Sequence, residues 1–318
     1  MRILVTGASG FLGSWICRVL AVTEDVCALT RKSSSLRNLS NIPDLRINQV
    51  ETKDWPRFIE DYKPEVIILN DWEGVENSFR NDVRQFENVA RHSKLVNSAK
   101  SCGVKTIIGV GSQAELGPVD SQITELVSDN PTSNYGEAKV QNRIALQKQV
   151  ENTDIQFIWM RIFSTYGPLD EGSWLIPNIV QSLERNEVIN LTKGEQEWSY
   201  LHAYDLAEAF AAVLNSPYIR GIVNVGNPNT ISIREVALTI GNVLKKQDLL
   251  AFGSLDYRQD QVMKMKPVCE TLGDLGWVPQ IGFDSGIKQT IDWLTGKVLA
   301  PLKTMNHETL YFNLPTRT

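Results

Sequence analysis

The chain has 318 residues, of which 42% are hydrophobic and 22% charged, and its formal net charge is -5. Basic and acidic residues are mixed along it, which argues against nucleic acid or an anionic membrane surface as a partner. No apolar run approaches the roughly 20 residues that cross a bilayer, and a first strand beginning at Arg2 leaves no room for a signal peptide. We therefore expect a cytoplasmic protein without membrane insertion. Four scattered cysteines and three scattered histidines indicate reduced thiols and no metal site.

The amino terminus has the pattern of a dinucleotide-binding turn. An apolar run, Ile3–Val5, stops at Thr6, and three glycines spaced GxxGxxG then precede an apolar helical stretch. This order of strand, glycine turn and helix aims the first helical amides at a pyrophosphate. A glycine turn without a ligand is the alternative. Six residues are predicted to contact the dinucleotide: Gly7, Ser9, Gly10, Phe11, Leu12 and Gly13.

The first half of the chain alternates short apolar or β-branched runs with helical patterns. This alternation predicts an α/β fold, in which a doubly wound parallel sheet (the Rossmann arrangement) is covered by helices on both faces. Ligands of such sheets bind beyond the carboxyl ends of the strands. The predicted strands are Ile3–Val5, Val26–Leu29, Leu45–Val50, Val66–Leu69, Thr106–Val110 and Phe157–Arg161, and the longest predicted helices are Phe86–Cys102 and Tyr135–Gln149.

The end of the second predicted strand bears on the choice of dinucleotide. NAD-binding chains place Asp or Glu there, about 20 residues beyond the glycines, to hold the ribose 2′-hydroxyl. This chain instead has Arg31 and Lys32, two cations suited to a 2′-phosphate. We therefore expect NADP(H) as the preferred cofactor, with NAD as the alternative if both cations are only solvated.

Three residues further along form a catalytic pattern. Ser112 ends the fifth predicted strand, and Tyr135 and Lys139 lie one turn apart on the same face of a predicted helix. With the glycine turn, they resemble the Ser-Tyr-Lys arrangement of the short-chain dehydrogenase/reductase superfamily, in its extended branch. The resemblance implies that Asn88 supports the lysine and a water relay. An ordinary polar residue on a helix is the alternative for Asn88.

These residue types suit proton transfer to a carbonyl oxygen. A phenol with an ordinary pKa near 10 is a poor base at neutral pH, and a neighbouring ammonium such as that of Lys139 favours the phenolate. Tyr135 would then exchange a proton with the substrate oxygen while hydride is transferred, and Ser112 would donate a hydrogen bond to that oxygen.

The resemblance to the extended NAD(P)-dependent epimerase/dehydratase family covers roughly residues 1–295. It implies a dinucleotide-binding domain over 1–168 that also takes segments near 200–228. A smaller, interleaved α/β substrate domain lies mainly within 169–300, and 301–318 form a tail. The apolar patch Leu310–Phe312 in that tail either docks on the fold or is disordered. By the same resemblance we expect a homodimer.

The resemblance also assigns contacts to individual positions. Several positions depart from the family pattern: Ser164 replaces an asparagine, and Trp198-Ser199 replace an Arg-Asp pair. The strand that ends at Leu69 is followed by Asn70, Asp71 and Trp72 in place of small residues. Further cofactor contacts are implied for Glu51, Leu69, Asn70, Tyr135, Lys139 and Ile162, and substrate contacts for Gln113, Ser164, Trp174, Trp198 and Arg258.

Two enzymatic functions fit these residues. The first is NADPH-dependent reduction of the C4 keto group of a nucleotide-activated 4-keto-6-deoxyhexose, in deoxysugar or surface-polysaccharide biosynthesis. The second is epimerisation of a nucleotide sugar with tightly held NAD. A dehydratase is less favoured, because it commonly needs an Asp-Glu pair beside the serine and Gln113 interrupts that place; Glu115 remains available as an acid. A nucleotide-sensing regulator on the same fold is a third hypothesis, although such proteins typically lose the tyrosine or the lysine.

Overall fold

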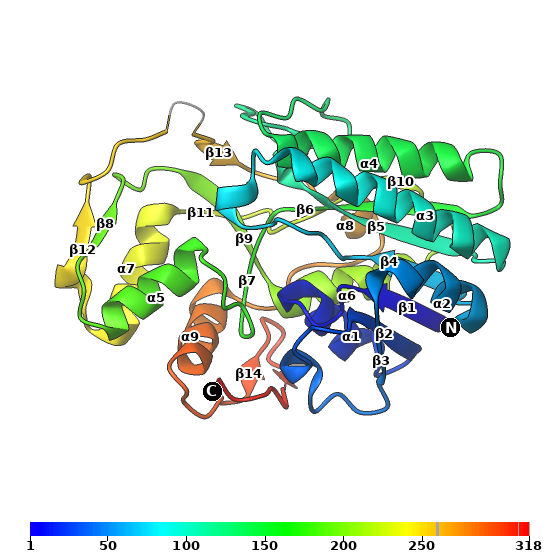
Figure 1. The fold of residues 1–318 in the computed structure, drawn as a ribbon. Coiled ribbons are helices and arrows are strands. Elements are labelled where there is room, and N and C mark those ends of the chain that lie inside the picture. The colour runs from blue at the N-terminus through cyan, green and yellow to red at the C-terminus, as the bar shows by residue number, and fades with distance from the viewer. Residues whose placement is uncertain (259–260, 311, 318) are drawn as a thin grey trace.

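A seven-stranded parallel sheet forms the centre of the computed structural model, which describes residues 1–258, 261–310 and 312–317 (Figure 1). The strand order is β10-β6-β5-β4-β1-β2-β3. From β1 the chain adds β2 and β3 on one side, and from β4 it adds strands on the other side, so the order of connection reverses between β1 and β4. This confirms the predicted doubly wound sheet and places a ligand crevice at that reversal. The strands are β1 (Arg2–Thr6), β2 (Asp25–Arg31), β3 (Arg46–Val50), β4 (Val66–Leu69), β5 (Thr106–Ser112), β6 (Gln156–Ile162) and β10 (Gly221–Val225).

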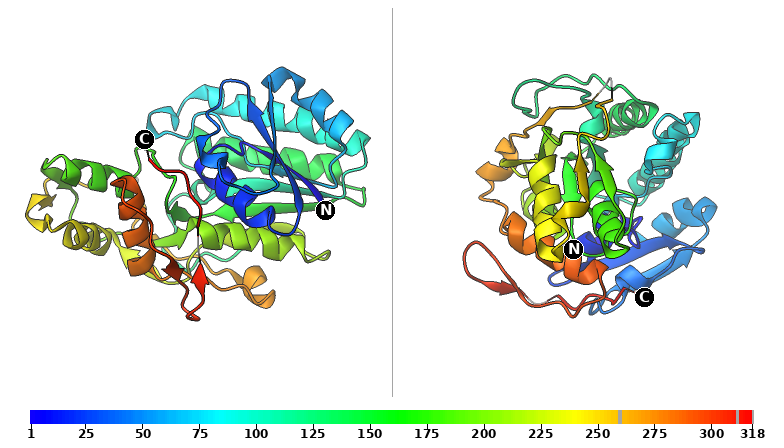
Figure 2. Two further views of the ribbon diagram at one scale, coloured as in Figure 1. Left: turned by 90° about the horizontal axis from the view of Figure 1, so that it is seen from below. Right: turned by 90° about the vertical axis from the view of Figure 1, so that its left-hand side faces the viewer.

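Helices cover both faces of the sheet (Figures 1 and 2). The strands are apolar on both faces for this reason: in β1, Ile3 and Val5 pack in the cluster that contains α1 and α6, whereas Leu4 packs in the cluster with α2 and α3. No described helix is long and apolar enough to span a membrane. The covering helices are α1 (Phe11–Leu20) and α6 (Ala203–Leu214) on one face, and α2 (Trp55–Tyr62), α3 (Glu87–Ser101) and α4 (Asn134–Val150) on the other.

A second lobe lies beside the carboxyl ends of the strands (Figure 1). Two small sheets hold it together, one with the order β11-β9-β13 plus β7 on β9, the other pairing β12 with β8. Its helices are α5 (Leu175–Glu184), α7 (Ile233–Leu244) and α9 (Phe283–Leu294), whereas α8 (Glu270–Asp274) packs against β10 and α6 of the main lobe. Its strands are β7 (Ser164–Tyr166), β8 (Ile189–Leu191), β9 (Glu197–His202), β11 (Thr230–Ser232), β12 (Leu250–Phe252) and β13 (Lys264–Met265).

Short 3-10 turns occur in both lobes. They are η1 (Arg37–Leu39), η2 (Thr52–Asp54), η3 (Asn77–Phe79), η4 (Val83–Phe86), η5 (Gln113–Glu115) and η6 (Gln247–Leu249).

The two halves are interleaved in sequence. After β6 the chain enters the second lobe through β7, α5, β8 and β9, and then returns to the main sheet with α6 and β10. The buried Asp205 in the first turn of α6 ties this return to the second lobe, because its carboxylate accepts hydrogen bonds from the N–H groups of Gln280 and Ile281 at 2.8 and 3.0 Å. A domain boundary at residue 168 stays a prediction.

The tail packs across the fold and includes a short hairpin, β14 (Leu302–Lys303) and β15 (Thr309–Leu310). Phe312 stands edge-on against the buried Trp15 of α1, with ring centroids 5.0 Å apart. The indole N–H of Trp293 in α9 donates to the carbonyl of Pro315 at 2.8 Å. Of the two outcomes considered for the patch 310–312, docking is therefore seen at Phe312, while Tyr311 lies outside the described residues.

Candidate active site

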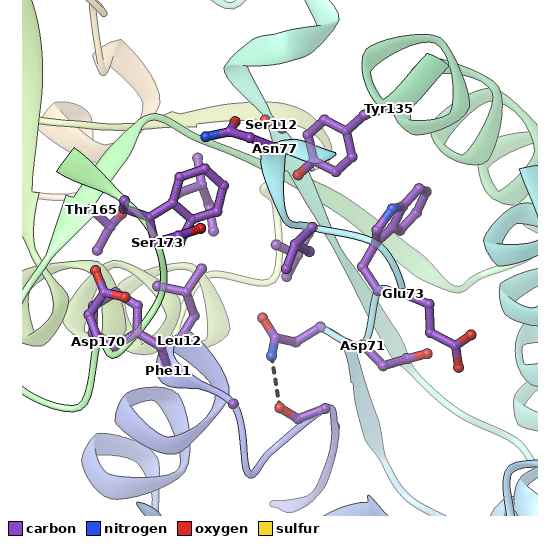
Figure 3. Close-up of a pocket in the computed structure, with 18 of the residues that line it drawn as sticks. Phe11, Leu12, Asp71, Glu73, Asn77, Ser112, Tyr135, Thr165, Asp170 and Ser173 are labelled. Atoms are coloured by element: carbon purple, nitrogen blue, oxygen red, sulfur yellow. Dashed lines mark hydrogen bonds between the residues drawn. The ribbon is translucent and has the colours of Figure 1, made fainter. Parts of the chain in front are cut away.

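A cavity of about 1180 Å³ lies between the sheet and the second lobe. Phe11 and Leu12 of α1 and Asp170 border it on the side away from Tyr135, which points into it from α4 with Ser112 beside it (Figure 3). The sheet reversal and the cavity therefore coincide. The predicted contact residues in its wall are Gly7, Ser9, Gly10, Phe11, Leu12, Arg31, Asn70, Ser112, Gln113, Tyr135, Lys139, Ile162, Ser164, Trp174, Trp198 and Arg258.

The glycine turn forms one end of this cavity. Gly7 has φ 61°, and a Cβ there would lie 2.7 Å from the Cα of Asp71, so only glycine fits between β1 and β4. Helix α1 starts with Gly10 as its N-cap, and no side chain of the described residues caps it. The first amides of α1 are thus open toward the cavity at the positive end of the helix dipole. These residues fit the pyrophosphate of a dinucleotide.

Ser112 is fixed where β5 turns into η5. Its hydroxyl oxygen accepts a hydrogen bond from the N–H of Ala114 at 3.2 Å, and its own N–H donates to Oε1 of Glu115 at 2.7 Å. This capping box fixes the side chain at the end of β5, beside Tyr135 in the cavity wall (Figure 3). The two hydroxyls can therefore meet on one substrate oxygen.

Tyr135 is carried into the site by the amino terminus of α4. The helix begins after Ser133, whose hydroxyl accepts from the N–H of Gly136 at 3.2 Å. A Cβ on Gly136 would lie 2.2 Å from the carbonyl oxygen of Ala114, so glycine lets α4 press against η5. Burial raises the pKa of Tyr135, while its hydrogen bond with Ser112 opposes that shift. In the protein alone, Tyr135 is thus a protonated phenol, ready to donate.

Lys139 lies one turn further along α4 and is only 4% exposed. Its ammonium donates to the carbonyl of Val110 in β5 at 2.8 Å. Burial lowers its pKa to about 7, an effect opposed by the carboxylates of Glu115 and Asp71. A small change in surroundings therefore decides whether this lysine is charged near neutral pH.

Asn88 is fixed against the loop after β4, and its implied support of Lys139 through a water relay stays a prediction. It is fully buried in the first turn of α3, and its amide binds the backbone of Glu73 on both sides: Oδ1 accepts from the N–H at 2.9 Å and Nδ2 donates to the carbonyl at 3.1 Å. Arg91 also donates to Asn88 Oδ1 at 2.5 Å. Asn88 therefore holds the loop after β4, and its hydrogen bonds go to that loop and to its own helix.

The cofactor end of the cavity contains an ion pair across the crevice. Arg31 ends β2, and its Nη1 lies 3.8 Å from Oε1 of Glu73, with both side chains 56% exposed. Asn70 follows β4, and its amide donates to the carbonyl of Gly7 at 3.2 Å. Four predicted cofactor contacts lie outside the cavity wall, although the structure describes each of them: Gly13, Lys32, Glu51 and Leu69.

The chain is similar to known proteins over most of its length. The profile of the NAD dependent epimerase/dehydratase family matches residues 3–226. The chain belongs to this family. Among curated relatives of this epimerase/dehydratase family member, the dTDP-D-glucose 4,6-dehydratase of Mus musculus is 25% identical over 317 residues, covering 92% of this chain and 88% of the mouse protein. The CDP-abequose synthase of Salmonella muenchen is 25% identical over 143 residues, covering 44% and 49% of the two chains.

Solved structures agree on the fold. The UDP-glucose 4-epimerase of Thermus thermophilus, solved in complex with NAD, superposes with a TM-score of 0.83 at 23% sequence identity, covering 94% of this chain and all of that one. At 23% identity, this similarity is evidence for a shared fold only. The seven-stranded sheet and the second lobe therefore share the arrangement of that epimerase.

Glu115 is fully buried beneath the site. It does not line the cavity formed by the described residues. Its carboxylate lies 3.0 Å from the guanidinium of Arg161, also fully buried, and accepts from the indole N–H of Trp159 at 3.0 Å. The interpretation of Glu115 as an available acid is therefore wrong. Gln113 occupies the wall beside Ser112 in place of a carboxylate.

The structure adds a charged cluster that the sequence patterns did not assign to the site. Asp71 lines the cavity after β4, where it meets Arg91 at 2.9 Å, His92 at 3.2 Å and the hydroxyl of Thr6 at 2.5 Å. Burial opposes its ionisation, but the contacts with His92, with the guanidinium of Arg91 and with the hydroxyl of Thr6 hold the pKa of Asp71 below the ordinary value. The available signal was the replacement of small residues by Asn70-Asp71-Trp72.

Proposed function

We propose that this chain reduces the C4 keto group of a nucleotide-activated 4-keto-6-deoxyhexose with NADPH. The observation that carries the proposal is the placement of Ser112 and Tyr135 side by side in the cavity wall (Figure 3), with Lys139 one turn behind Tyr135 on α4. Dehydration is disfavoured, since Gln113 stands beside Ser112 and Glu115 is locked in a buried ion pair. The relatives named for nucleotide-linked sugars, a dTDP-D-glucose 4,6-dehydratase and a CDP-abequose synthase, support a nucleotide-linked sugar as the substrate.

Each of these residues has a separate role in the proposed ketone reduction. The nicotinamide supplies hydride when bound, and the glycine turn with the amides of α1 would hold its pyrophosphate. Ser112 donates a hydrogen bond to the ketone oxygen, where negative charge develops. Tyr135 gives that oxygen its proton, which completes the alcohol. The Lys139 ammonium stabilises the phenolate left behind.

An NAD-dependent epimerase is the second candidate, and one observation favours it. The carboxylate of Glu73 faces Arg31 across the crevice, so part of the positive charge available to a 2′-phosphate is already paired. The Thermus thermophilus epimerase with the same fold was solved with NAD. The same Ser112, Tyr135 and Lys139 would then oxidise and reduce one carbon in turn.

The cofactor retained by the protein separates the two candidates. A reductase exchanges its dinucleotide at each turnover, so we expect the purified protein to carry little cofactor and to oxidise added NADPH when given a nucleotide-linked 4-keto-6-deoxyhexose. Acid extraction with chromatography of the released dinucleotide, together with absorbance of NADPH during the reaction, measures both. Stoichiometric bound NAD without net NADPH consumption would assign the epimerase instead.

Arg31 carries the expected preference for NADPH. Replacing it with alanine removes the guanidinium nearest to the 2′-position, so we expect the KM for NADPH to rise about tenfold or more, which corresponds to about 1.4 kcal/mol. The KM for NADH should change less than twofold. Arg185→Ala is the matched control, because Arg185 lies outside the cavity wall of the described residues and has no predicted cofactor contact. An equal effect of Arg31→Ala on both cofactors would contradict the assignment.

We further propose that the chain binds its nucleotide sugar as a homodimer formed through α3 and α4. Ile144 on α4 and Val83 just before α3 are 52% and 74% exposed, which leaves apolar side chains on this face. Light scattering coupled to gel filtration would give twice the chain mass of 35.7 kDa.

A further inference from the structure

We propose that Trp72 is a positioning residue that holds the Lys139 ammonium in place beside Tyr135. The inference rests on the proposed hydride-transfer function, and it concerns a residue that stands where the family pattern has a small one. Trp72 follows β4 and lines the cavity together with Tyr135 and Lys139. Its indole would serve as a fixed aromatic surface for the lysine before any ligand enters.

The geometry is that of a cation held over an aromatic ring. The Nζ of Lys139 lies 3.7 Å from the centroid of the Trp72 ring and 5.7 Å from that of Tyr135. One ammonium N–H is used by the carbonyl of Val110. With the indole covering a second direction, the third N–H is left for a hydroxyl of a bound ligand. Trp72 therefore restricts Lys139 and still leaves it one N–H donor for a ligand.

Trp72 is itself immobilised. Its indole N–H donates to Oε1 of Gln85 at 2.7 Å, and Gln85 is 1% exposed. The Nε2 of Gln85 donates to the carbonyls of Gly74 and Phe79 at 2.5 and 3.0 Å, which ties it to the loop on which Trp72 stands. Edge-on contacts with Tyr135 and His92, at 6.1 and 5.7 Å between centroids, fix the plane of the ring.

A fixed indole matters because the ammonium is out of water. The charges that bear on Lys139 are the carboxylates of Glu115 and Asp71, which favour its charged form, and the guanidinium of Arg91, which opposes it. Arg80 acts on Tyr135 from the loop after η3. An aromatic face adds attraction for the cation alone, so it favours the protonated lysine that stabilises a Tyr135 phenolate.

The test is a tyrosinate titration that needs neither sugar nor turnover. Ultraviolet absorbance is followed against pH with saturating NADP⁺ and, separately, NAD⁺, for each variant and for the same variant carrying Tyr135→Phe; the difference isolates Tyr135. Trp72→Leu removes the aromatic face, so Tyr135 should titrate about one pH unit higher, a tenfold loss of phenolate. Trp72→Phe keeps a weaker face and should shift the titration in the same direction by less.

Three outcomes would overturn the proposal: an unshifted or lowered titration in Trp72→Leu, equal shifts in the leucine and phenylalanine variants, or a shift of the same size in Phe79→Leu. The last is the matched control, an aromatic on the same loop outside the cavity wall. If Trp72→Leu does not fold, the phenylalanine variant decides alone, with no shift counting against the proposal. A wrong substrate assignment would appear as missing turnover and leave these titrations unaffected.

Discussion

Tyr135→Phe is expected to lower kcat by about 10²- to 10⁴-fold, the range typical of a lost general acid. The variant removes one oxygen atom and leaves the ring, so its edge-on contact with Trp72 is retained. The ketone oxygen would still meet Ser112 but would receive its proton from water. Single-turnover measurements of NADPH oxidation with a nucleotide-linked 4-keto sugar check this directly, because they exclude product release.

Cofactor affinity provides the control for this variant. The glycine turn and Arg31 lie at the other end of the cavity, so the dissociation constant for NADPH in Tyr135→Phe should remain within about threefold of wild type. Full turnover by the variant would refute the assigned proton donor. A large loss of NADPH binding would instead show that the phenol hydroxyl supports the cofactor site.

Arg161→Met is expected to lower the free energy of unfolding by about 3–5 kcal/mol, because it leaves the carboxylate of Glu115 buried without its ionic partner. Both side chains are fully buried, and the Nη2 of Arg161 also reaches Asp129 at 3.1 Å. Chemical denaturation followed by tryptophan fluorescence measures the change. Activity should fall as well, since Glu115 holds the N–H of Ser112.

The control for Arg161→Met is an exposed pair of similar length. Arg185 and Glu187 approach to 2.8 Å with both side chains more than half exposed, so Arg185→Met should cost less than about 1 kcal/mol. Adding Glu115→Gln to Arg161→Met removes the uncompensated charge and should restore part of the lost stability. Equal losses in Arg161→Met and Arg185→Met would show that burial of the ion pair is unimportant.

The sheet and the catalytic residues could be predicted because their signals are local. Each strand of the main sheet in the first half is an apolar run ending at a polar or glycine turn, and the observed ends differ from the predicted ones by no more than two residues. Tyr135 and Lys139 share a helix, so a spacing of four fixes their relation. Ser112 ends a buried strand, and such strand ends converge on one edge of a parallel sheet.

What sequence could not provide is the pairing of side chains across elements. From the sequence, Glu115 looks like an unpaired acid in its loop. In the structure it forms an ion pair with Arg161 of the neighbouring strand β6. From the sequence, Arg31 looks like a free phosphate ligand. In the structure the loop after β4 places Glu73 beside it. Asn88 likewise contacts a loop fifteen residues earlier in the chain. These relations depend on which strands become neighbours.

The return of the chain to the main sheet sets an order for folding during synthesis. Strand β10 pairs with β6 only after β7, α5, β8, β9 and α6 have been made, yet α6 packs on α1 and closes one face of the cofactor half. A nascent chain that ends between residues 162 and 203 therefore exposes both the outer edge of β6 and the apolar face around Trp15. The glycine turn is therefore synthesised about two hundred residues before β10, the strand that completes the sheet around it.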